Sequence, residues 1–536
     1  MRYGFVIDNR VCIGCHACTV ACKAEHLVPI GVNRTWVKYI ERGEFPNVSR
    51  NFQVTRCNHC VDAPCVTICP TSALFTRKDG IVDFDQRRCI GCKSCTQACP
   101  YDAIYIDPNQ GTAAKCNFCA HRIDQGLNPS CVNICPEQAI HFGDLDDPKS
   151  DVAQLTSREP VSQRKPEKGT MPSIFYIEGD TASLNPAATS MPESTMWSSQ
   201  NKGVGHNAGK DGSATDLLGI VRRAQATRAE RNDSPEPVLD GLLRDMEKAT
   251  GSSKVRRAYD QPDKGIQWGW EVAAYVVTKA LSAGAALVCA LAFILPMLGV
   301  QAFALNPVGS LYQVVLPIVS LVFLGVTGLL LIKDLDKPMR FVYVLLRPHW
   351  SSWLVRGGYI ITVTGGLTTL WLANGLFIQS SFLFEALAWP LAISALACAT
   401  YTAFLFGQCK GRDFWQSPAL PIHMLNHAPL AGFAVLALIG RDVRWALFVF
   451  ALINLAVVAF EIWGKHPNED SAATAHDIQT GRAGRLFWFG VIGIGGLLPL
   501  GLLIVNAPFS AALAILIGLA ITEYLWVFMP QKRPNT

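Results

Sequence analysis

Charged side chains are scarce in this sequence. They make up 17% of its 536 residues, whereas hydrophobic side chains make up 50%, and a soluble globular protein averages about 25% charged residues. The net charge of +5 is small and spread along the chain, so we expect no nucleic-acid partner. These averages conceal a division, because every long apolar run follows Trp270 and most cysteines precede it.

Several common sequence signals are also missing. The first residues have no apolar signal core and no twin-arginine pair, so we expect the cysteine-rich part to stay in a reducing compartment. There is no P-loop, dinucleotide-binding glycine motif or nucleophile elbow. These absences exclude the common nucleotide-dependent and hydrolytic enzymes. We therefore expect a non-catalytic subunit of an oxidoreductase rather than an enzyme with its own substrate-transforming site.

The chain divides into three regions. Residues 1–150 carry sixteen of the nineteen cysteines, and residues 267–536 carry the apolar runs. Between them, residues 151–266 are rich in proline, serine, glycine and charge, which predicts a polar linker. Within the linker, Ile174–Ile177 is predicted to be a short strand, and apolar residues at helical spacing predict a short helix over 234–246. We interpret both as docking points on a neighbouring surface.

The sixteen cysteines form four groups with ferredoxin-type spacing. The groups are Cys12, Cys15, Cys18 and Cys22; Cys57, Cys60, Cys65 and Cys69; Cys89, Cys92, Cys95 and Cys99; and Cys116, Cys119, Cys131 and Cys135. Three thiolates on one tight loop hold three irons of a cubane, and the fourth points to the other cluster of a pair. Proline follows the last cysteine of three groups, and we expect it in the first turn of a helix.

Four such groups predict four [4Fe–4S] clusters in an α+β domain built from two bacterial-ferredoxin-like units. Zinc is an alternative, because paired C-x2-C motifs also suit tetrahedral zinc. Zinc sites seldom place four cysteines in one short run, however, and they do not need the trailing proline. Disulfides are disfavoured by the expected reducing compartment.

The C-terminal region predicts an all-α polytopic membrane bundle of about eight helices, since a span needs about 20 apolar residues. The expected spans are residues 272–299, 311–332, 353–375, 382–406, 418–439, 445–463, 486–505 and 508–528. His423 and His427 lie at i, i+4 on one helix face, so they cannot hold one haem between them. No other helix interior supplies a histidine. We therefore expect no haem.

Lysine and arginine are unevenly distributed between the two sets of loops. Thirteen lie on the side from which residue 266 enters the bundle, and two, Arg441 and Arg444, lie on the other side. The positive-inside rule places the richer side in the cytoplasm. We expect a multi-pass protein of the cytoplasmic (inner) membrane, with the iron–sulfur domain facing the cytoplasm.

Ionisable groups in hydrocarbon are costly and usually mark a site or a pathway. The candidates are Tyr275, Lys279, Asp334, His423 and His427. Other polar groups near helix ends can instead extend to the membrane interface or cap a loop, namely Glu271, Asp336, Arg356 and Glu523.

The cysteine-rich part resembles a known family. The stretches RCNHCVDAPCVTICPTSAL, RRCIGCKSCTQACPYDAI and KCNFCAHRIDQGLNPSCVNICPEQAI are similar to the iron–sulfur subunit of the dimethyl sulfoxide and polysulfide reductase type of molybdoenzyme. The resemblance implies four ligand sets in which the outer motifs cooperate and so do the inner ones. These are Cys12/Cys15/Cys18/Cys135, Cys22/Cys116/Cys119/Cys131, Cys57/Cys60/Cys65/Cys99 and Cys69/Cys89/Cys92/Cys95. It also implies a molybdopterin-containing catalytic subunit as partner at the Cys12 end.

The membrane part resembles the NrfD-type polysulfide reductase anchor. The similar stretches are WGWEVAAYVVTKALSAG, DLDKPMRFVYVLLRPHWSSWLVRGG and FWQSPALPIHMLNHAPLAGFA. This resemblance implies a site for menaquinone or ubiquinone at the cluster-facing end, with Tyr275, Lys279, Asp334, His423 and His427 as candidates.

The combined expectation is an electron-transfer and membrane-anchor subunit of a quinone-linked molybdopterin oxidoreductase. The cytoplasmic orientation favours donor oxidation of the sulfite-dehydrogenase type, by analogy. The alternatives are a module of an energy-conserving complex with a proton path, and a zinc-stabilised membrane scaffold without a redox role.

Overall fold

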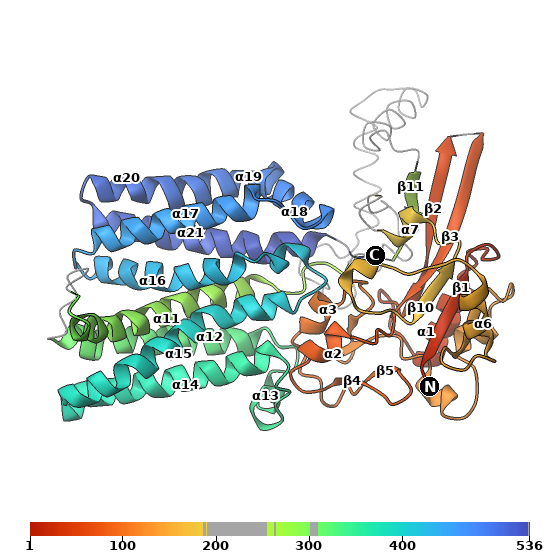
Figure 1. Ribbon diagram of the computed structural model, residues 1–536, viewed down its shortest axis with the longest axis horizontal. Helices are drawn as coiled ribbons and strands as arrows, with labels where there is room; N and C mark the ends of the chain where they lie inside the picture. Colours follow the sequence, from red (N-terminus) through yellow and green to blue (C-terminus); the bar gives the residue numbers. More distant parts are fainter. Residues whose placement is uncertain are drawn as a thin grey trace, which may run out of the picture.

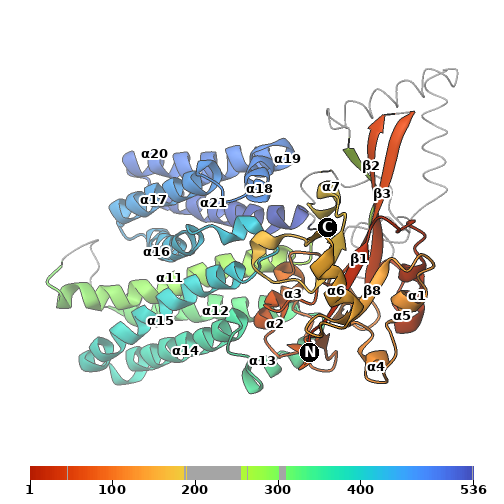
Figure 2. The same ribbon diagram turned by 45° about the vertical axis from the view of Figure 1, so that its right-hand side comes forward.

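The computed structural model describes residues 1–44, 46–185, 189, 255–261, 264–300, 309–533 and 535. A part rich in short strands and helices lies at one end of the molecule, and a bundle of long helices lies at the other (Figure 1). In both views α2 (Pro64–Ile68) and α3 (Ser94–Ala98) lie between the strands and the ends of the long helices (Figure 2). This arrangement confirms the predicted fold class.

A four-stranded sheet with the order β8-β1-β10-β9 closes the N-terminal domain. Its strands are β1 (Tyr3–Asp8), β8 (Ile140–Asp144), β9 (Val161–Ser162) and β10 (Ile174–Ile177). The central strand β1 pairs in parallel with β10 and antiparallel with β8. Phe5, Val6 and Ile7 are all fully buried, as expected for a strand covered on both faces.

Short helices and two-stranded hairpins alternate around the cysteine loops. The helices are α1 (Ala17–His26), α2, α3, α4 (Ala120–Ile123) and α5 (Ser130–Asn133), and the hairpins are β4 (Leu74–Thr76) with β5 (Val82–Phe84) and β6 (Tyr105–Asp107) with β7 (Thr112–Ala114). A longer sheet of β2 (Thr35–Glu44), β3 (Asn47–Arg56) and β11 (Val255–Tyr259) projects from the domain (Figure 1).

The prediction that a helix begins at each Cys-Pro pair is wrong. Helix α2 ends at Ile68, and Cys69 is its C-cap; helix α3 likewise ends before Cys99. The following Pro70 therefore comes just after a helix, where its ring prevents the helix from continuing. The chain then turns into the next hairpin.

The folded domain extends beyond the boundary expected at residue 150. The first part of the predicted linker forms α6 (Asp151–Arg158), β9, a 3-10 turn (Pro166–Lys168), β10 and α7 (Thr181–Leu184). Val152, Ile174 and Tyr176 are fully buried, so their apolar side chains add this segment to the domain core. The strand predicted at Ile174–Ile177 is confirmed as β10. The helix predicted over 234–246 lies outside the described residues.

Eight helices of the described residues are long and apolar enough to cross a membrane, which confirms the predicted number. They cover Trp270–Met297, Leu311–Lys333, Trp353–Ile378, Ser381–Gly407, Leu420–Leu438, Arg444–Trp463, Gly481–Ile504 and Pro508–Lys532. Their main segments are α11 (Trp270–Met297), α12 (Leu316–Lys333), α14 (Trp353–Ala373), α15 (Ser381–Gly407), α16 (Leu420–Leu438), α17 (Arg444–Trp463), α20 (Leu498–Ile504) and α21 (Pro508–Phe528).

Helices α11 and α16 form the centre of the bundle. They are the most buried of the eight, and their backbones cross at Gly284 and Gly432. A Cβ atom at Gly284 would overlap the carbonyl oxygen of Ala428, so only glycine allows this approach. Small residues at helix contacts are the usual device of membrane bundles.

The N-terminal domain is attached to the bundle by hydrogen bonds from the helix ends. Trp268 Nε1 donates to the carbonyl oxygen of Cys92 (3.0 Å), and Ser352 Oγ donates to the carbonyl oxygen of Ile68 (2.6 Å). Arg412 Nε donates to the side chain of Gln97 (2.7 Å). Because these bonds reach the backbone and flanks of α2 and α3, the second and third cysteine groups are fixed against the membrane helices.

Candidate metal centres and the membrane cavity

All nineteen cysteines are free thiols, so no disulfide holds the N-terminal domain. The sixteen N-terminal cysteines gather into four sets of four, each named here by one of its members. The sets are the Cys12 set (Cys12, Cys15, Cys18, Cys135), the Cys22 set (Cys22, Cys116, Cys119, Cys131), the Cys57 set (Cys57, Cys60, Cys65, Cys99) and the Cys89 set (Cys69, Cys89, Cys92, Cys95). The tertiary structure thus groups the cysteines as the family resemblance implies.

The four sets lie in a row. Cys18 interacts electrostatically with the Cys22 set, Cys57 with the Cys22 set, and Cys95 with the Cys57 set. The Cys12 set is at one end, where Cys15 is exposed. The Cys89 set is at the other end, against the helix ends of the bundle.

Two of the four cysteine loops have glycine just before their second cysteine, where the packing leaves no room for a Cβ atom. Gly14 and Gly91 have φ angles of +69° and +70°, which side chains rarely adopt. A Cβ atom at Gly14 would also overlap the ring of Phe52. Backbone N–H groups then point at sulfur atoms, as in the contacts of Ala73 N with Cys69 Sγ (3.2 Å) and of Ala139 N with Cys135 Sγ (3.3 Å).

An unbalanced buried cation tests whether these sets fit iron–sulfur clusters. Arg56 is fully buried, and its Nη1 donates to Cys131 Sγ at 3.0 Å. Its Nε and Nη2 atoms have no hydrogen-bond partner among the described residues. A buried guanidinium needs an anion, and a [4Fe–4S] cluster with four thiolates supplies negative charge and sulfur acceptors. The donor set and the charge therefore fit.

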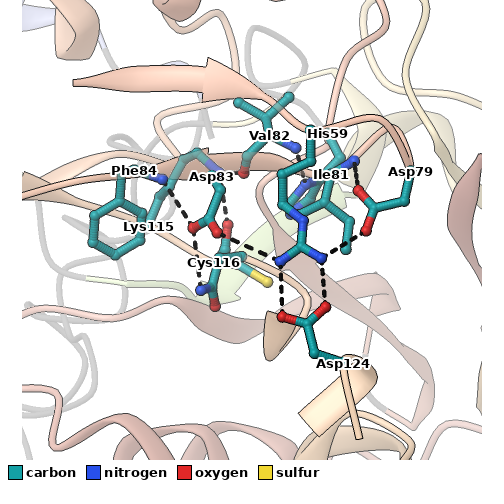
Figure 3. Close-up of polar contacts among 11 residues, drawn as sticks. His59, Asp79, Ile81, Val82, Asp83, Phe84, Lys115, Cys116 and Asp124 are labelled. Atoms are coloured by element: carbon teal, nitrogen blue, oxygen red, sulfur yellow. Dashed lines mark hydrogen bonds and ion pairs between the residues drawn. The ribbon is translucent and has the colours of Figure 1, made fainter. Parts of the chain in front are cut away.

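Lys115 is a second buried cation, located between the Cys22 and Cys57 sets. Its Nζ donates to the carbonyl oxygens of Val82 and Cys116, the latter at 2.9 Å (Figure 3). The ring of His59 lies beside Phe118 with 3.6 Å between the ring centroids, and His59 Nδ1 accepts from Val82 N at 3.1 Å (Figure 3). These contacts hold the positive charge of Lys115 and the stacked rings in place beside the Cys22 and Cys57 sets.

A cavity of about 220 Å³ lies where the Cys89 set meets the bundle. Its wall is mainly apolar, with contributions from α11, α12, α14 and α15, and Cys92 belongs to the lining. The polar groups in the wall include Tyr275, Tyr401 and Asp334. The apolar wall and the few polar groups are typical of a small-molecule site.

Asp334 is positioned at the end of α12 by a lysine of the cluster domain. Lys93 Nζ donates to the Asp334 carbonyl oxygen (2.6 Å) and lies 3.4 Å from its Oδ1 atom. Burial raises the pKa of the Asp334 carboxyl to about 7, although Lys93 opposes that shift. A carboxyl with a pKa near neutrality can exchange protons at physiological pH.

Three of the five residues predicted at the quinone site do not line this cavity. Lys279 lies behind Tyr401, with its Nζ 4.8 Å from the ring centroid, and donates to Thr402 Oγ1 (2.7 Å). His423 and His427 lie on α16 and contact carboxylates of α17 and α21. The i, i+4 spacing predicts their shared face, but the neighbouring helices determine which surface that face meets.

Sequence reasoning missed Tyr401 and Trp268. Tyr401 lies inside a long apolar run, and only its phenol oxygen distinguishes it from the neighbouring core residues. Trp268 comes just before the first span, where an interfacial tryptophan is ordinary. Its hydrogen bond to Cys92 depends on the packing of two distant segments, so no local signal could have found it.

Comparisons with known proteins match each part of the chain separately. Residues 11–74 and 48–145 match models described as 4Fe-4S dicluster domains. Relatives include a subunit of the tetrathionate reductase of Salmonella typhimurium, 44% identical over 189 residues (34% of this chain and 76% of the relative). A chain of the polysulfide reductase of Wolinella succinogenes is 39% identical over 179 residues (33% and 94%). The arsenate respiratory reductase iron–sulfur subunit of Shewanella sp. is 38% identical over 227 residues (33% and 96%).

The helical part matches one family model over nearly all of its length. Residues 260–531, just over half of the chain, match the model described as polysulphide reductase, NrfD. This range contains all eight candidate spans, except that it ends one residue before the end of the last span at Lys532. This multi-pass membrane protein therefore belongs to the polysulphide reductase NrfD family, with 4Fe-4S dicluster domains fused ahead of the NrfD part.

Proposed function

We propose that this chain relays electrons between a molybdopterin-containing catalytic subunit and a membrane quinone through four [4Fe–4S] clusters. The observation that carries the proposal is the cavity between the Cys89 set and the bundle, because one wall is a cluster loop and another carries an ionisable carboxyl. When bound, the clusters supply one-electron transfer along the row. The protein arranges the clusters in a row, places buried cations beside them and provides the groups that exchange protons.

The row of cysteine sets gives the relay two distinct ends. At the outer end Cys15 is exposed, and the side chains of Val11 and Ile13 beside it are 42% and 53% exposed. An apolar surface next to an exposed ligand suits contact with a protein partner. The relatives are named as parts of tetrathionate, polysulfide and arsenate reductases. We infer that a catalytic subunit docks at this end.

The cavity has the chemistry that a quinone needs. Its apolar wall accommodates the ring and the start of an isoprenoid tail. Asp334 and Tyr275 offer a proton donor and a hydrogen bond for the quinone oxygens. Trp268 links α11 to Cys92 through its Nε1 hydrogen bond, so the cavity wall and the last cluster loop form one rigid unit. Menaquinone and ubiquinone both meet this description.

The orientation follows from loop charge. Thirteen lysine and arginine residues of the loops lie on the side of the iron–sulfur domain, against two on the other side. By the positive-inside rule this domain faces the cytoplasm, with the bundle in the inner membrane. A cytoplasmic catalytic subunit then oxidises its donor, as a sulfite dehydrogenase does, and the chain passes the electrons to quinone.

Filling the cavity tests the proposal. Gly358 lines it on α14, and a Cβ atom there makes only ordinary contacts of 3.7 Å, with Leu345 and Val344. Gly358→Leu should therefore fold and project into the cavity. Gly366 lies on the same helix with nothing within 4 Å of an added Cβ atom, so Gly366→Leu is the matched control.

The dithionite-reduced protein is mixed rapidly with a short-chain quinone, and the rate at which the protein is reoxidised is measured. We expect Gly358→Leu to slow reoxidation at least tenfold and Gly366→Leu to leave it unchanged, with equal iron content in both. Equal reoxidation rates in the two variants would place the quinone elsewhere.

A further inference from the structure

A cluster of buried ionisable groups lies in the half of the bundle away from the cavity. His423 and His427 extend from α16, Glu461 from α17 and Glu523 from α21, and all four are buried. One nitrogen of each histidine and one Glu523 oxygen lie within 4.8 Å of one another. None of the four residues lines the cavity described above. The proposed electron relay therefore leaves this cluster without a role.

Each histidine ring is held through one nitrogen by a neighbouring acceptor. His423 Nδ1 lies 2.7 Å from Glu461 Oε2, and that oxygen also accepts from Trp526 Nε1 at 2.9 Å. His427 Nε2 lies 3.0 Å from Asn454 Oδ1. Because a carboxylate oxygen only accepts, the first contact places a ring proton on His423 Nδ1, and the Asn454 oxygen can accept a proton from His427 Nε2 in the same way. Metal-binding histidines are usually oriented in this way, by an acceptor on the second nitrogen.

The remaining nitrogens both face Glu523. His427 Nδ1 lies 2.8 Å from Glu523 Oε1, and His423 Nε2 lies 3.7 Å from the same oxygen. With neutral rings whose protons face Glu461 and Asn454, the nitrogens that face Glu523 carry lone pairs and converge on a buried carboxylate. His423 Nε2 has no hydrogen-bond partner in the described part of the chain, and neither has Glu461 Oε1. A positive charge between these groups, either a shared proton or a metal ion, satisfies such an arrangement.

Distance distinguishes a metal ion from a shared proton. At 3.7 Å, His423 Nε2 is too far from Glu523 Oε1 for a hydrogen bond. Two ligand atoms about 2.0–2.1 Å from a tetrahedral ion are about 3.3 Å apart. The two nitrogen–oxygen distances, 2.8 and 3.7 Å, lie on either side of this value, and all three ligand atoms lie within 4.8 Å of one another. A proton on His427 alone would leave His423 Nε2 unsatisfied.

We propose that His423, His427 and Glu523 form a binding site for a divalent transition-metal ion, with zinc as the ion of matching chemistry. Two imidazoles and one carboxylate are a common zinc ligand set, and two histidines at i, i+4 on a helix bind zinc in known motifs. Glu461 holds the opposite ring nitrogen of His423, so it orients that ligand instead of binding the ion. Two carboxylates balance the charge of the ion, and the ion links α16 to α21.

Zinc content and coordination test this site. The full-length protein is purified without a polyhistidine tag, exposed to zinc, washed with a weak chelator and assayed for zinc and iron. Zinc K-edge X-ray absorption then identifies the neighbours. We expect about one zinc per chain, with nitrogen and oxygen at about 2.0–2.1 Å and no sulfur at about 2.3 Å. A low iron content identifies samples in which clusters have been lost and zinc has bound to the cysteine sets instead.

Variants assign the ion to these residues. His423→Gln and Glu523→Gln should each lower the zinc content at least tenfold. His476→Gln should not, because His476 is an exposed histidine of α18 (Glu469–Gln479). A wild-type protein that retains no zinc would overturn the proposal and leave an ion-paired network of histidine and glutamate. Zinc bound by sulfur, or zinc retained in both variants, would overturn it too. The wild-type spectrum decides the question even if a variant does not fold.

Discussion

The buried cations beside the cysteine sets and the buried histidines of the bundle have different partners. In the domain, Arg56 and Lys115 are fully buried, and no carboxylate of the described residues forms a salt bridge with either. In the bundle, His423 and His427 each contact a buried carboxylate. Lone cations beside thiolates indicate that an anionic cofactor completes the domain. A buried carboxylate in hydrocarbon needs such a partner, because an isolated ionised group there is costly.

The largest effect that we expect on this contrast comes from removing a cluster ligand. Cys65 belongs to the Cys57 set and is buried. Cys65→Ala should lower the iron content by about four atoms, from about 16 per chain, because the cube loses one of its four thiolates. Cys289→Ala is the control, since Cys289 is also buried but packs among apolar residues of the bundle. Loss of iron in both variants, or in neither, would contradict the assignment.

Removing the positive charge of Arg56 should have a smaller effect, because all four clusters should remain bound. In Arg56→Gln the negative cluster of the Cys22 set loses a positive charge in contact with Cys131. We expect the equilibrium constant for reduction of this cluster to fall at least tenfold, which lowers its reduction potential by about 59 mV for one electron. A redox titration followed by electron paramagnetic resonance measures this shift. Arg56→Lys keeps the charge and should restore most of the potential; an unchanged potential in Arg56→Gln would show that the buried cation is not electrostatically coupled to the cluster.

The smallest expected effect concerns the carboxyl between the two regions. Burial raises the pKa of Asp334 to about 7, so the group is mostly protonated below that pH and mostly ionised above it. If Asp334 donates a proton to the quinone, the rate of quinone reduction should fall as the pH rises through about 7. Asp334→Asn should lower the rate several-fold and flatten this profile.

The control for that profile is Asp336→Asn. Asp336 also faces Lys93, at 3.5 Å, but does not line the cavity. Stopped-flow reoxidation at several pH values should show the wild-type slope in this variant. A slope that persists in Asp334→Asn would assign the proton to another group.

Much of the fold could be read from local patterns. The eight spans follow from apolar runs whose length is set by the thickness of the bilayer, and the structure confirms them. The Ile174–Ile177 strand was predicted correctly as an element, but not as the strand paired in parallel with β1. That pairing joins residues almost 170 positions apart. No local pattern contains such information, so the domain boundary was placed too early.

The candidate sites divide in the same way. The spacing of the cysteines is a covalent property of the chain, and it determined by itself that this protein holds iron–sulfur clusters. Hydropathy determined that it crosses a membrane. Only the tertiary structure decided that Asp334 and Tyr275 share a cavity with Cys92, whereas His423 and His427 turn towards Glu461 and Glu523. The reason is that a side chain's partner depends on which helix packs against it, and helix packing is a property of the whole bundle.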